Sequence, residues 1–266
     1  MYMNKQQLIK QRIKQLIEGC TAGLSAQIEW FTQYNQPVKI IDDALSEVIT
    51  AATNDTLCGG TGGGGWDHKD NAEVKGTSHV QSRFCANCGK KVSFFATECP
   101  HCGCESFKAK AKQKGTKVTN PRDGRWGISA MSHFKYKPEL KEYRLTIVEP
   151  LTDDPSCREF RYTYFVVDKD SVHLNNYAKA QLESPKSDNI NFQPYGVDFY
   201  LSLPVMKFTG VLTVYKDYTK FEFEFFDLNN TTPLDIPDRF VNITSKEVIA
   251  KKKRRLGKKR GEWRRN

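Results

Sequence analysis

Two closely spaced pairs of cysteines restrict what this chain can fold into more than any other feature of its sequence. Cys85 and Cys88 form the first pair, Cys99 and Cys102 form the second, and ten residues separate the pairs. A glycine follows each pair and permits a tight turn beneath the sulfurs. Because two such pairs complete a tetrahedral shell of thiolates, the spacing predicts a closed structural site for Zn²⁺, with iron as the alternative metal.

Residues 84–104, which contain these pairs, resemble a zinc ribbon over about 20 residues. A closed shell of four cysteines leaves no open coordination position, so the predicted metal stabilises structure and takes no part in a reaction. Cys104 lies two residues beyond Cys102 and offers an alternative ligand in another register. We expect His101 to lie outside the metal shell. A zinc ribbon alone does not indicate a function, because such modules bind DNA, join subunits or stabilise loops.

The positive charge of the chain is concentrated at its C-terminal end. Residues 250–266 contain ten lysines and arginines and one glutamate, and so carry nearly all of the net charge of +10. A basic run of this kind attracts polyanions, and nucleic acid is the commonest polyanion inside a cell. We therefore expect nucleic acid as the partner, with the tail gripping its phosphates.

The sequence also bears on where the protein acts. No stretch approaches the roughly 18 uncharged apolar residues that a membrane-spanning helix needs, and the charged N-terminus lacks the apolar core of a signal peptide. Paired cysteines in a reducing compartment indicate a metal more often than a disulfide. These observations predict a cytoplasmic protein without membrane contact.

Hydrophobic periodicity predicts a mixed α/β fold. Apolar residues recur at helical spacing near the N-terminus, where Gly19 offers a helix stop and Ser25 and Asp42 offer N-caps. The expected helices cover 4–18, 25–34, 42–52 and 170–183. The expected strands cover 72–77, 143–149, 160–167, 197–203, 210–215 and 220–228. In the last of these strands, phenylalanines alternate with glutamates, which predicts that the phenylalanines face the core.

A short cluster of acidic and basic residues precedes the cysteine pairs. In the expected strand 72–77, Glu73 and Lys75 point to the same face while Val74 points into the core. Residues 68–71 have the composition of a turn, so a hairpin would bring Asp67 close to Glu73. Metal-dependent cleavage of a phosphodiester bond requires such groups, because carboxylates hold Mg²⁺ and a lysine steadies the developing charge.

This cluster resembles the PD-(D/E)XK nuclease superfamily, and type II restriction endonucleases in particular. Asp67 and the run Glu73-Val74-Lys75 carry the resemblance, with a helical segment before them. The resemblance implies a central mixed sheet flanked by helices, with the zinc ribbon as a small insertion. It also implies that Asp67 and Glu73 bind Mg²⁺, that Lys75 is catalytic and that a helix carboxylate, Glu47, joins the site. A tryptophan precedes Asp67 where the family has a proline, and the spacing to Glu73 is short for the family.

The implied protein is a Mg²⁺-dependent, sequence-specific endonuclease of a restriction-modification system, which hydrolyses double-stranded DNA in the bacterial cytoplasm. Such enzymes act as homodimers, since a palindromic target mirrors a two-fold axis. The expected organisation is a helical segment (1–55), a nuclease-like core (56–83 and 105–248), the ribbon (84–104) and a basic tail (249–266). The expected DNA contacts follow the ribbon and lie in the tail: Lys108, Lys110, Arg122, Arg125, Lys251, Lys252, Lys253, Arg254 and Arg255.

The sequence leaves three alternatives open. An acid-x-Lys motif also occurs at 67–69, so Asp55, Asp67 and Lys69 form a second possible active-site register. The ribbon and the tail are also compatible with a non-enzymatic zinc-ribbon protein that binds nucleic acid. Finally, His68 ahead of a four-cysteine site suggests a zinc-containing nuclease of the histidine type, although its usual His or Asn partner is not evident in the sequence.

Overall fold

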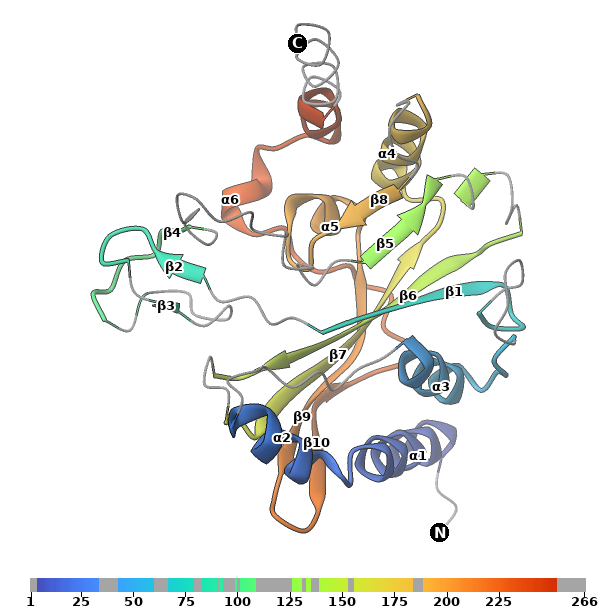
Figure 1. Ribbon diagram of the computed structural model, residues 1–266. Coiled ribbons are helices and arrows are strands. Elements are labelled where there is room, and N and C mark those ends of the chain that lie inside the picture. The colour runs from blue at the N-terminus through green and yellow to red at the C-terminus, as the bar shows by residue number, and fades with distance from the viewer. Residues whose placement is uncertain are drawn as a thin grey trace, which may run out of the picture.

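Figure 1 shows the computed structural model of the chain, which describes residues 4–33, 43–59, 67–78, 83–89, 91–92, 99, 101–108, 126–130, 133–134, 139–152, 156–183 and 189–252. Its centre is a five-stranded sheet in the order β1-β6-β7-β9-β10. These strands are β1 (Ala72–Ser78), β6 (Glu142–Pro150), β7 (Glu159–Asp168), β9 (Val205–Val214) and β10 (Thr219–Phe226). β1 runs parallel to β6, and the other neighbours are antiparallel. The predicted mixed α/β fold is thereby confirmed.

Three N-terminal helices cover one face of the sheet and lie below it in Figure 1. They are α1 (Lys5–Cys20), α2 (Leu24–Gln33) and α3 (Asp43–Asn54). Asn4 begins α1 with a capping box, in which its side chain accepts a hydrogen bond from the Gln7 amide at 2.9 Å. Ile9, Ile13 and Ile17 recur at helical spacing along α1 and are buried against aromatic side chains of the sheet.

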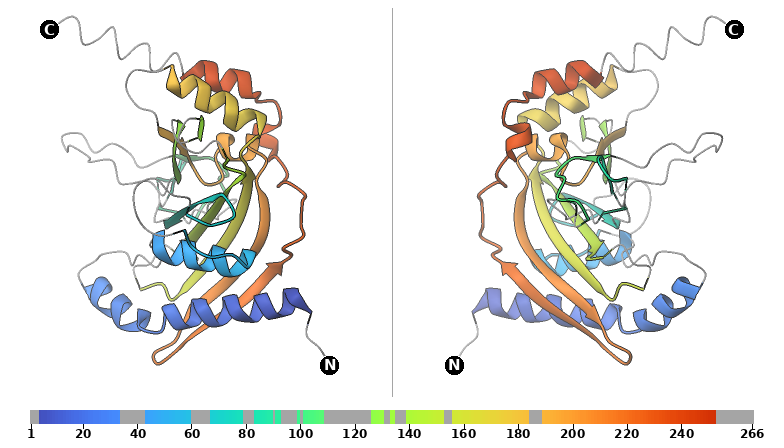
Figure 2. Two further views of the ribbon diagram at one scale, coloured as in Figure 1. Left: turned by 90° about the vertical axis from the view of Figure 1, so that its right-hand side faces the viewer. Right: turned by 90° about the vertical axis from the view of Figure 1, so that its left-hand side faces the viewer.

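A second set of elements covers the opposite face. It consists of α4 (Val172–Leu182), α5 (Val197–Leu201) and a two-stranded sheet of β5 (Trp126–Ser129) and β8 (Asn189–Phe192). Trp126 is fully buried there, and its indole N–H donates to the Thr146 carbonyl at 2.9 Å. Each face of the main sheet therefore has its own apolar core. Figure 2 shows this order from the side, with α1 and α2 at one end of the molecule and α4 at the other.

Because other elements pack on both faces of the main sheet, β6 consists mainly of apolar residues. Its residues from Tyr143 to Glu149 are all buried, and a strand of this kind reads as a nearly continuous apolar run. Arg144 breaks that run, yet its side chain is only 5% exposed. A buried cation requires partners, and most of these partners lie in the hairpin that precedes β1.

The cysteine region forms a small sheet of its own, which lies to the left of the main sheet in Figure 1. Its strands are β2 (Arg83–Cys85), β3 (Lys91–Val92) and β4 (Phe107–Lys108), in the order β3-β2-β4. Near the C-terminus follow α6 (Asp238–Val241) and a helical stretch, residues 245–252, which lies beside α4 in Figure 2. Among the residues that the structure describes, no helix is long and apolar enough to span a membrane.

Two expectations about secondary structure are wrong. Residues 197–203 do not form a strand, because Val197–Leu201 form the helix α5 with Gly196 at its N-cap. Phe199 on this helix is buried against three aromatic side chains, so tertiary packing overrides the apolar pattern. Ser25 lies inside α2 and is not its N-cap, since the helix already begins at Leu24.

The alternation of phenylalanines in β10 is only partly regular. Phe221 is fully buried and Phe223 packs at the margin of the core, as predicted. The register with β9 then shifts between Phe223 and Phe225. Because a bulge reverses the faces of the residues after it, Phe226 packs against the core in place of Phe225.

Candidate functional site

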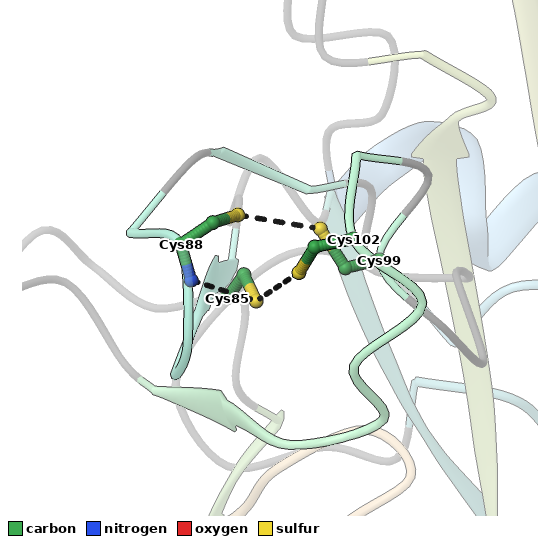
Figure 3. A group of neighbouring side chains, drawn as sticks. All are labelled: Cys85, Cys88, Cys99 and Cys102. Carbon is green, nitrogen blue, oxygen red and sulfur yellow. Dashed lines mark hydrogen bonds between the residues drawn. The ribbon is translucent and has the colours of Figure 1, made fainter.

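The two cysteine pairs converge on one point (Figure 3). The Sγ atoms of Cys85, Cys88, Cys99 and Cys102 all lie within 4.8 Å of one another. Across the pairs, the Sγ atoms of Cys85 and Cys102 are 3.5 Å apart, and the other two are 3.6 Å apart. Within the described parts of the chain, no other group of three or more His, Cys, Asp or Glu side chains brings its ligand atoms this close. These four thiols can hold a metal ion such as Zn²⁺.

Backbone geometry prepares the first pair for a metal. The amides of Asn87 and Cys88 both donate to Cys85 Sγ at 3.4 Å. Chiefly because of the hydrogen bond from Cys88, the pKa of Cys85 is lowered to about 6, which favours the thiolate that a metal requires. Gly89 and Gly103 have φ angles of +69° and +68°, a conformation that residues with a Cβ rarely adopt. The glycine after each pair is therefore required by the turn.

The geometry favours Cys102 over Cys104 as the ligand from the second pair. Cys104 accepts a hydrogen bond from the Cys99 amide through its carbonyl, at 2.9 Å, and its Sγ faces the Ser106 amide at 3.4 Å. Cys102 instead directs its sulfur toward Cys85 (Figure 3). His101 is exposed. The group of four therefore consists of the residues that the spacing predicts.

A second cluster joins Asp67, Glu73 and Lys75 at the edge of the main sheet. Lys75 Nζ lies 2.8 Å from Glu73 Oε1 and 3.6 Å from Asp67 Oδ2. The same Asp67 oxygen accepts the backbone N–H of Val74 at 2.8 Å, so the edge strand itself orients this carboxylate. In the parallel pairing of β1 with β6, Glu73 lies beside Tyr143 and Lys75 lies beside Leu145. These side chains are on the face of the sheet that points away from α3. The structure thus brings together three residues that the sequence analysis selected.

A buried polar network fixes the hairpin that carries Asp67. Arg144 donates two hydrogen bonds to the carboxylate of Asp70, a third to Glu142 and a fourth to His68 Nδ1. Such a fork of donors holds a carboxylate in one orientation. Since Asp70 and His68 flank the turn after Asp67, Arg144 connects this turn to the central strand β6.

His68 is a structural residue in this network. It is fully buried, its Nδ1 faces the Arg144 guanidinium, and its Nε2 lies 2.9 Å from the Glu47 carbonyl. Arginine only donates hydrogen bonds, so Nδ1 accepts and the proton resides on Nε2. Burial, with the nearby Arg144 charge, lowers the pKa of His68 and favours the neutral ring. Both ring nitrogens are therefore engaged inside the protein, which disfavours the histidine-type nuclease.

Glu47 reaches this region from the other side of β1. It lies on α3 and is partly exposed. Burial raises the pKa of Cys58, and the carboxylates of Glu47 and Asp67 raise it further, so both lie near this thiol. Cys58 in turn pairs with His68 in an isolated β-bridge. Glu47 therefore lies near the cluster.

The residues of the second register lie apart. Asp55 points toward α1, where Lys5 lies 3.1 Å and Arg12 3.4 Å from its carboxylate oxygens. These partners, Lys5 first, lower the pKa of Asp55. Lys69 is exposed, and its amide binds the Leu57 carbonyl. The structure does not assemble Asp55, Asp67 and Lys69 into one site.

Few of the expected DNA contacts lie in the part of the chain that the structure describes. Lys108 is in β4, and Lys251 is exposed on the C-terminal helical stretch. Lys252 is engaged within the protein: its Nζ lies 2.6 Å from Asp198 Oδ2 and 3.6 Å from the centre of the Tyr177 ring. The others lie outside the described residues: Lys110, Arg122, Arg125, Lys253, Arg254 and Arg255.

Two polar side chains near the cluster escaped the sequence analysis. His133 is fully buried and bridges Tyr143 Oη and Asn175 Oδ1, each at 2.8 Å. Burial and, to a lesser extent, the Glu73 carboxylate raise the pKa of Tyr143. Arg144 is the second residue that was missed. A charged residue within an otherwise apolar strand is the sequence signal that could have revealed it.

Comparisons of this chain with protein-family models, with curated proteins and with solved structures found no match.

One variant tests whether the Arg144 network holds the hairpin. We expect Arg144→Met to lower the free energy of unfolding by about 1–3 kcal/mol, because buried His68 would lose its hydrogen-bond donor while Asp70, which is 36% exposed, would be partly rehydrated. Urea unfolding followed by circular dichroism measures this change. Arg161→Met is the matched control on β7, since its partner Glu224 is 44% exposed and the loss should stay below about 1 kcal/mol. Equal effects of the two variants would contradict the assigned role.

Proposed function

We propose that this protein is a Mg²⁺-dependent endonuclease of the PD-(D/E)XK type that cleaves double-stranded DNA at specific sequences. The observation that carries the proposal is the convergence of Asp67 Oδ2 and Glu73 Oε1 on one cation, the Lys75 ammonium. Mg²⁺ is a hard ion that prefers carboxylate oxygens as ligands, and these two carboxylates already contact one common cation. The nearby lysine is the third group that phosphodiester hydrolysis calls for.

Each residue of the cluster has a role in this proposal. Asp67 and Glu73 would hold Mg²⁺, which when bound neutralises charge that develops on the phosphate. Lys75 would orient the attacking water and stabilise the leaving charge. Glu47 would complete the polar surroundings from α3. The network around Arg144 would keep Asp67 in place by fixing the turn after it.

The cysteine cluster would hold Zn²⁺ in a structural role. Its shell is complete with four thiolates, which leaves no position for substrate. The small sheet β3-β2-β4 is short, and strands of two or three residues bury little apolar surface. A metal would therefore supply most of the stability of this module.

The basic tail would add affinity for DNA without reading its sequence. Lysine and arginine side chains that neutralise phosphates release counterions, so binding should weaken steeply as salt rises. A homodimer is proposed as the active form, because the two strands of a palindromic target require two active sites.

The direct test is cleavage of plasmid and phage DNA by the purified protein with Mg²⁺. We expect discrete fragments with Mg²⁺ and none with Ca²⁺, which binds carboxylates without supporting the reaction. Ca²⁺ is a better control than a chelator, because a chelator would also strip the cysteine site. Agarose electrophoresis followed by sequencing of the fragment ends would identify the target.

A non-enzymatic zinc-ribbon protein that binds nucleic acid is the second candidate. The observation that favours it is that a cysteine cluster and a basic tail can bind nucleic acid without any contribution from the carboxylates. If the protein binds DNA but yields no fragments with Mg²⁺ or Mn²⁺, this second function replaces the first.

A further inference from the structure

Lys75 occupies the place between the two carboxylates of the candidate site. Its Nζ is 2.8 Å from Glu73 Oε1 and 3.6 Å from Asp67 Oδ2. A cation in this position interacts with both acids at once and compensates one of their two negative charges without a metal. The side chain of Lys75 acts here as an internal counterion.

Limited solvent exposure strengthens this interaction. The Glu73 side chain is 12% exposed, that of Asp67 22% and that of Lys75 29%. Water screens charges poorly in such surroundings, so two carboxylates brought together here would repel each other strongly without a positive charge. Any cation that binds this pair must compete with the ammonium that already compensates half of its charge.

The Asp67 carboxylate differs from the lysine in how firmly it is held. Asp67 Oδ2 accepts the Val74 amide at 2.8 Å, and the hairpin behind it is tied to Arg144 through Asp70. Lys75 carries its ammonium on a flexible four-carbon chain, which can move without any change in the strand. Asp67 is thus preorganised and the lysine is the movable member.

We propose that the Lys75 ammonium and a divalent metal ion are alternative occupants of the Asp67–Glu73 pair. This inference rests on the proposed function, because it assigns the metal to the same carboxylates. Binding of the metal displaces Lys75 from the pair toward the place where substrate would lie. The affinity for metal is therefore set by competition with the protein's own lysine, and DNA phosphates that attract the released ammonium would favour loading of the metal.

Calorimetric titration with Mg²⁺ alone, without DNA, tests this competition. Hard ions such as Mg²⁺ discriminate against thiolates, so protein loaded with Zn²⁺ at the cysteine cluster reports on the carboxylates. We expect Lys75→Met to bind Mg²⁺ about tenfold more tightly than the wild type, within the range of about 5- to 150-fold that is usual for coupled sites. Lys75→Arg, which retains the charge, should bind as weakly as the wild type.

Lys69→Met is the matched control, because it removes the same charge from an exposed position in the same hairpin. Its affinity for Mg²⁺ should change less than about twofold. Circular dichroism confirms that each variant is folded. If the wild type binds Mg²⁺ measurably and Lys75→Met binds it with the same or lower affinity, the proposed competition between Lys75 and the metal is wrong, while the carboxylate metal site stands. Absence of binding in both proteins overturns the carboxylate metal site and the proposed function with it.

Discussion

Glu73→Gln should reduce Mg²⁺-dependent cleavage of DNA by about 100-fold or more. The substitution keeps the shape of the side chain and removes one of the two negative charges that face the cation position. A bound metal contributes several kcal/mol to transition-state stabilisation, and each 1.4 kcal/mol is about a factor of ten in rate. Rates of plasmid cleavage under single-turnover conditions measure the effect directly.

The control for this experiment is Glu222→Gln. Glu222 lies on β10 at the opposite edge of the sheet, where it is exposed and pairs with Lys220 at 2.9 Å. Its removal should leave cleavage within about twofold of the wild type, since a surface ion pair contributes little. Cleavage that persists in Glu73→Gln at the wild-type rate would remove Glu73 from the site and leave the proposed mechanism without its central acid.

Cys85→Ser should abolish binding of Zn²⁺ at the cysteine cluster and unfold the region between β2 and β4. A structural zinc site contributes about 10–16 kcal/mol of apparent binding free energy in isolated small modules, whereas the strands described here are only two or three residues long and bury little apolar surface. We expect about one zinc ion per chain in the wild type and less than about a tenth of that in the variant. Elemental analysis and hydrogen exchange of residues 83–108 provide the two readouts.

The main sheet should survive this substitution. Among the described residues, its two cores contain none from the cysteine region, and so the thermal transition of the body should change little. Cys20→Ser is the control, because this thiol is exposed on α1 and lies outside the group of four. A wild-type protein that contains neither zinc nor iron, or a variant with the full metal content, would contradict the four-cysteine site.

The sequence was a good guide to features whose signal is local. The cysteine spacing predicted which four thiols gather, and the period of two in residues 72–77 predicted that Glu73 and Lys75 share a face. The turn composition of 68–71 predicted that Asp67 would approach them. Each of these inferences concerns residues that are close in the chain, where backbone geometry leaves few options.

The sequence was a poorer guide where residues far apart in the chain decide the outcome. The helix α5 forms because Phe199 packs against Trp126 of β5 and Phe165 of β7, and no local pattern records that. The basic character of Lys252 suggested a phosphate contact, yet Asp198 and Tyr177 bind its ammonium. Arg144 was also overlooked, since its role depends on a turn more than 70 residues earlier in the chain.

The parallel pairing of β1 with β6 has a consequence for how the protein assembles. Residues 79–141, which include the cysteine region, separate these two strands, whereas β6, β7, β9 and β10 are linked by shorter connections. Closing a long loop is entropically costly, so pairing over such distances forms late in folding. An ion that ties Cys85 to Cys102 shortens the loop that remains to be closed. We therefore expect newly made chains that lack zinc to collapse around the antiparallel strands first, and the edge strand with Glu73 and Lys75 to dock last.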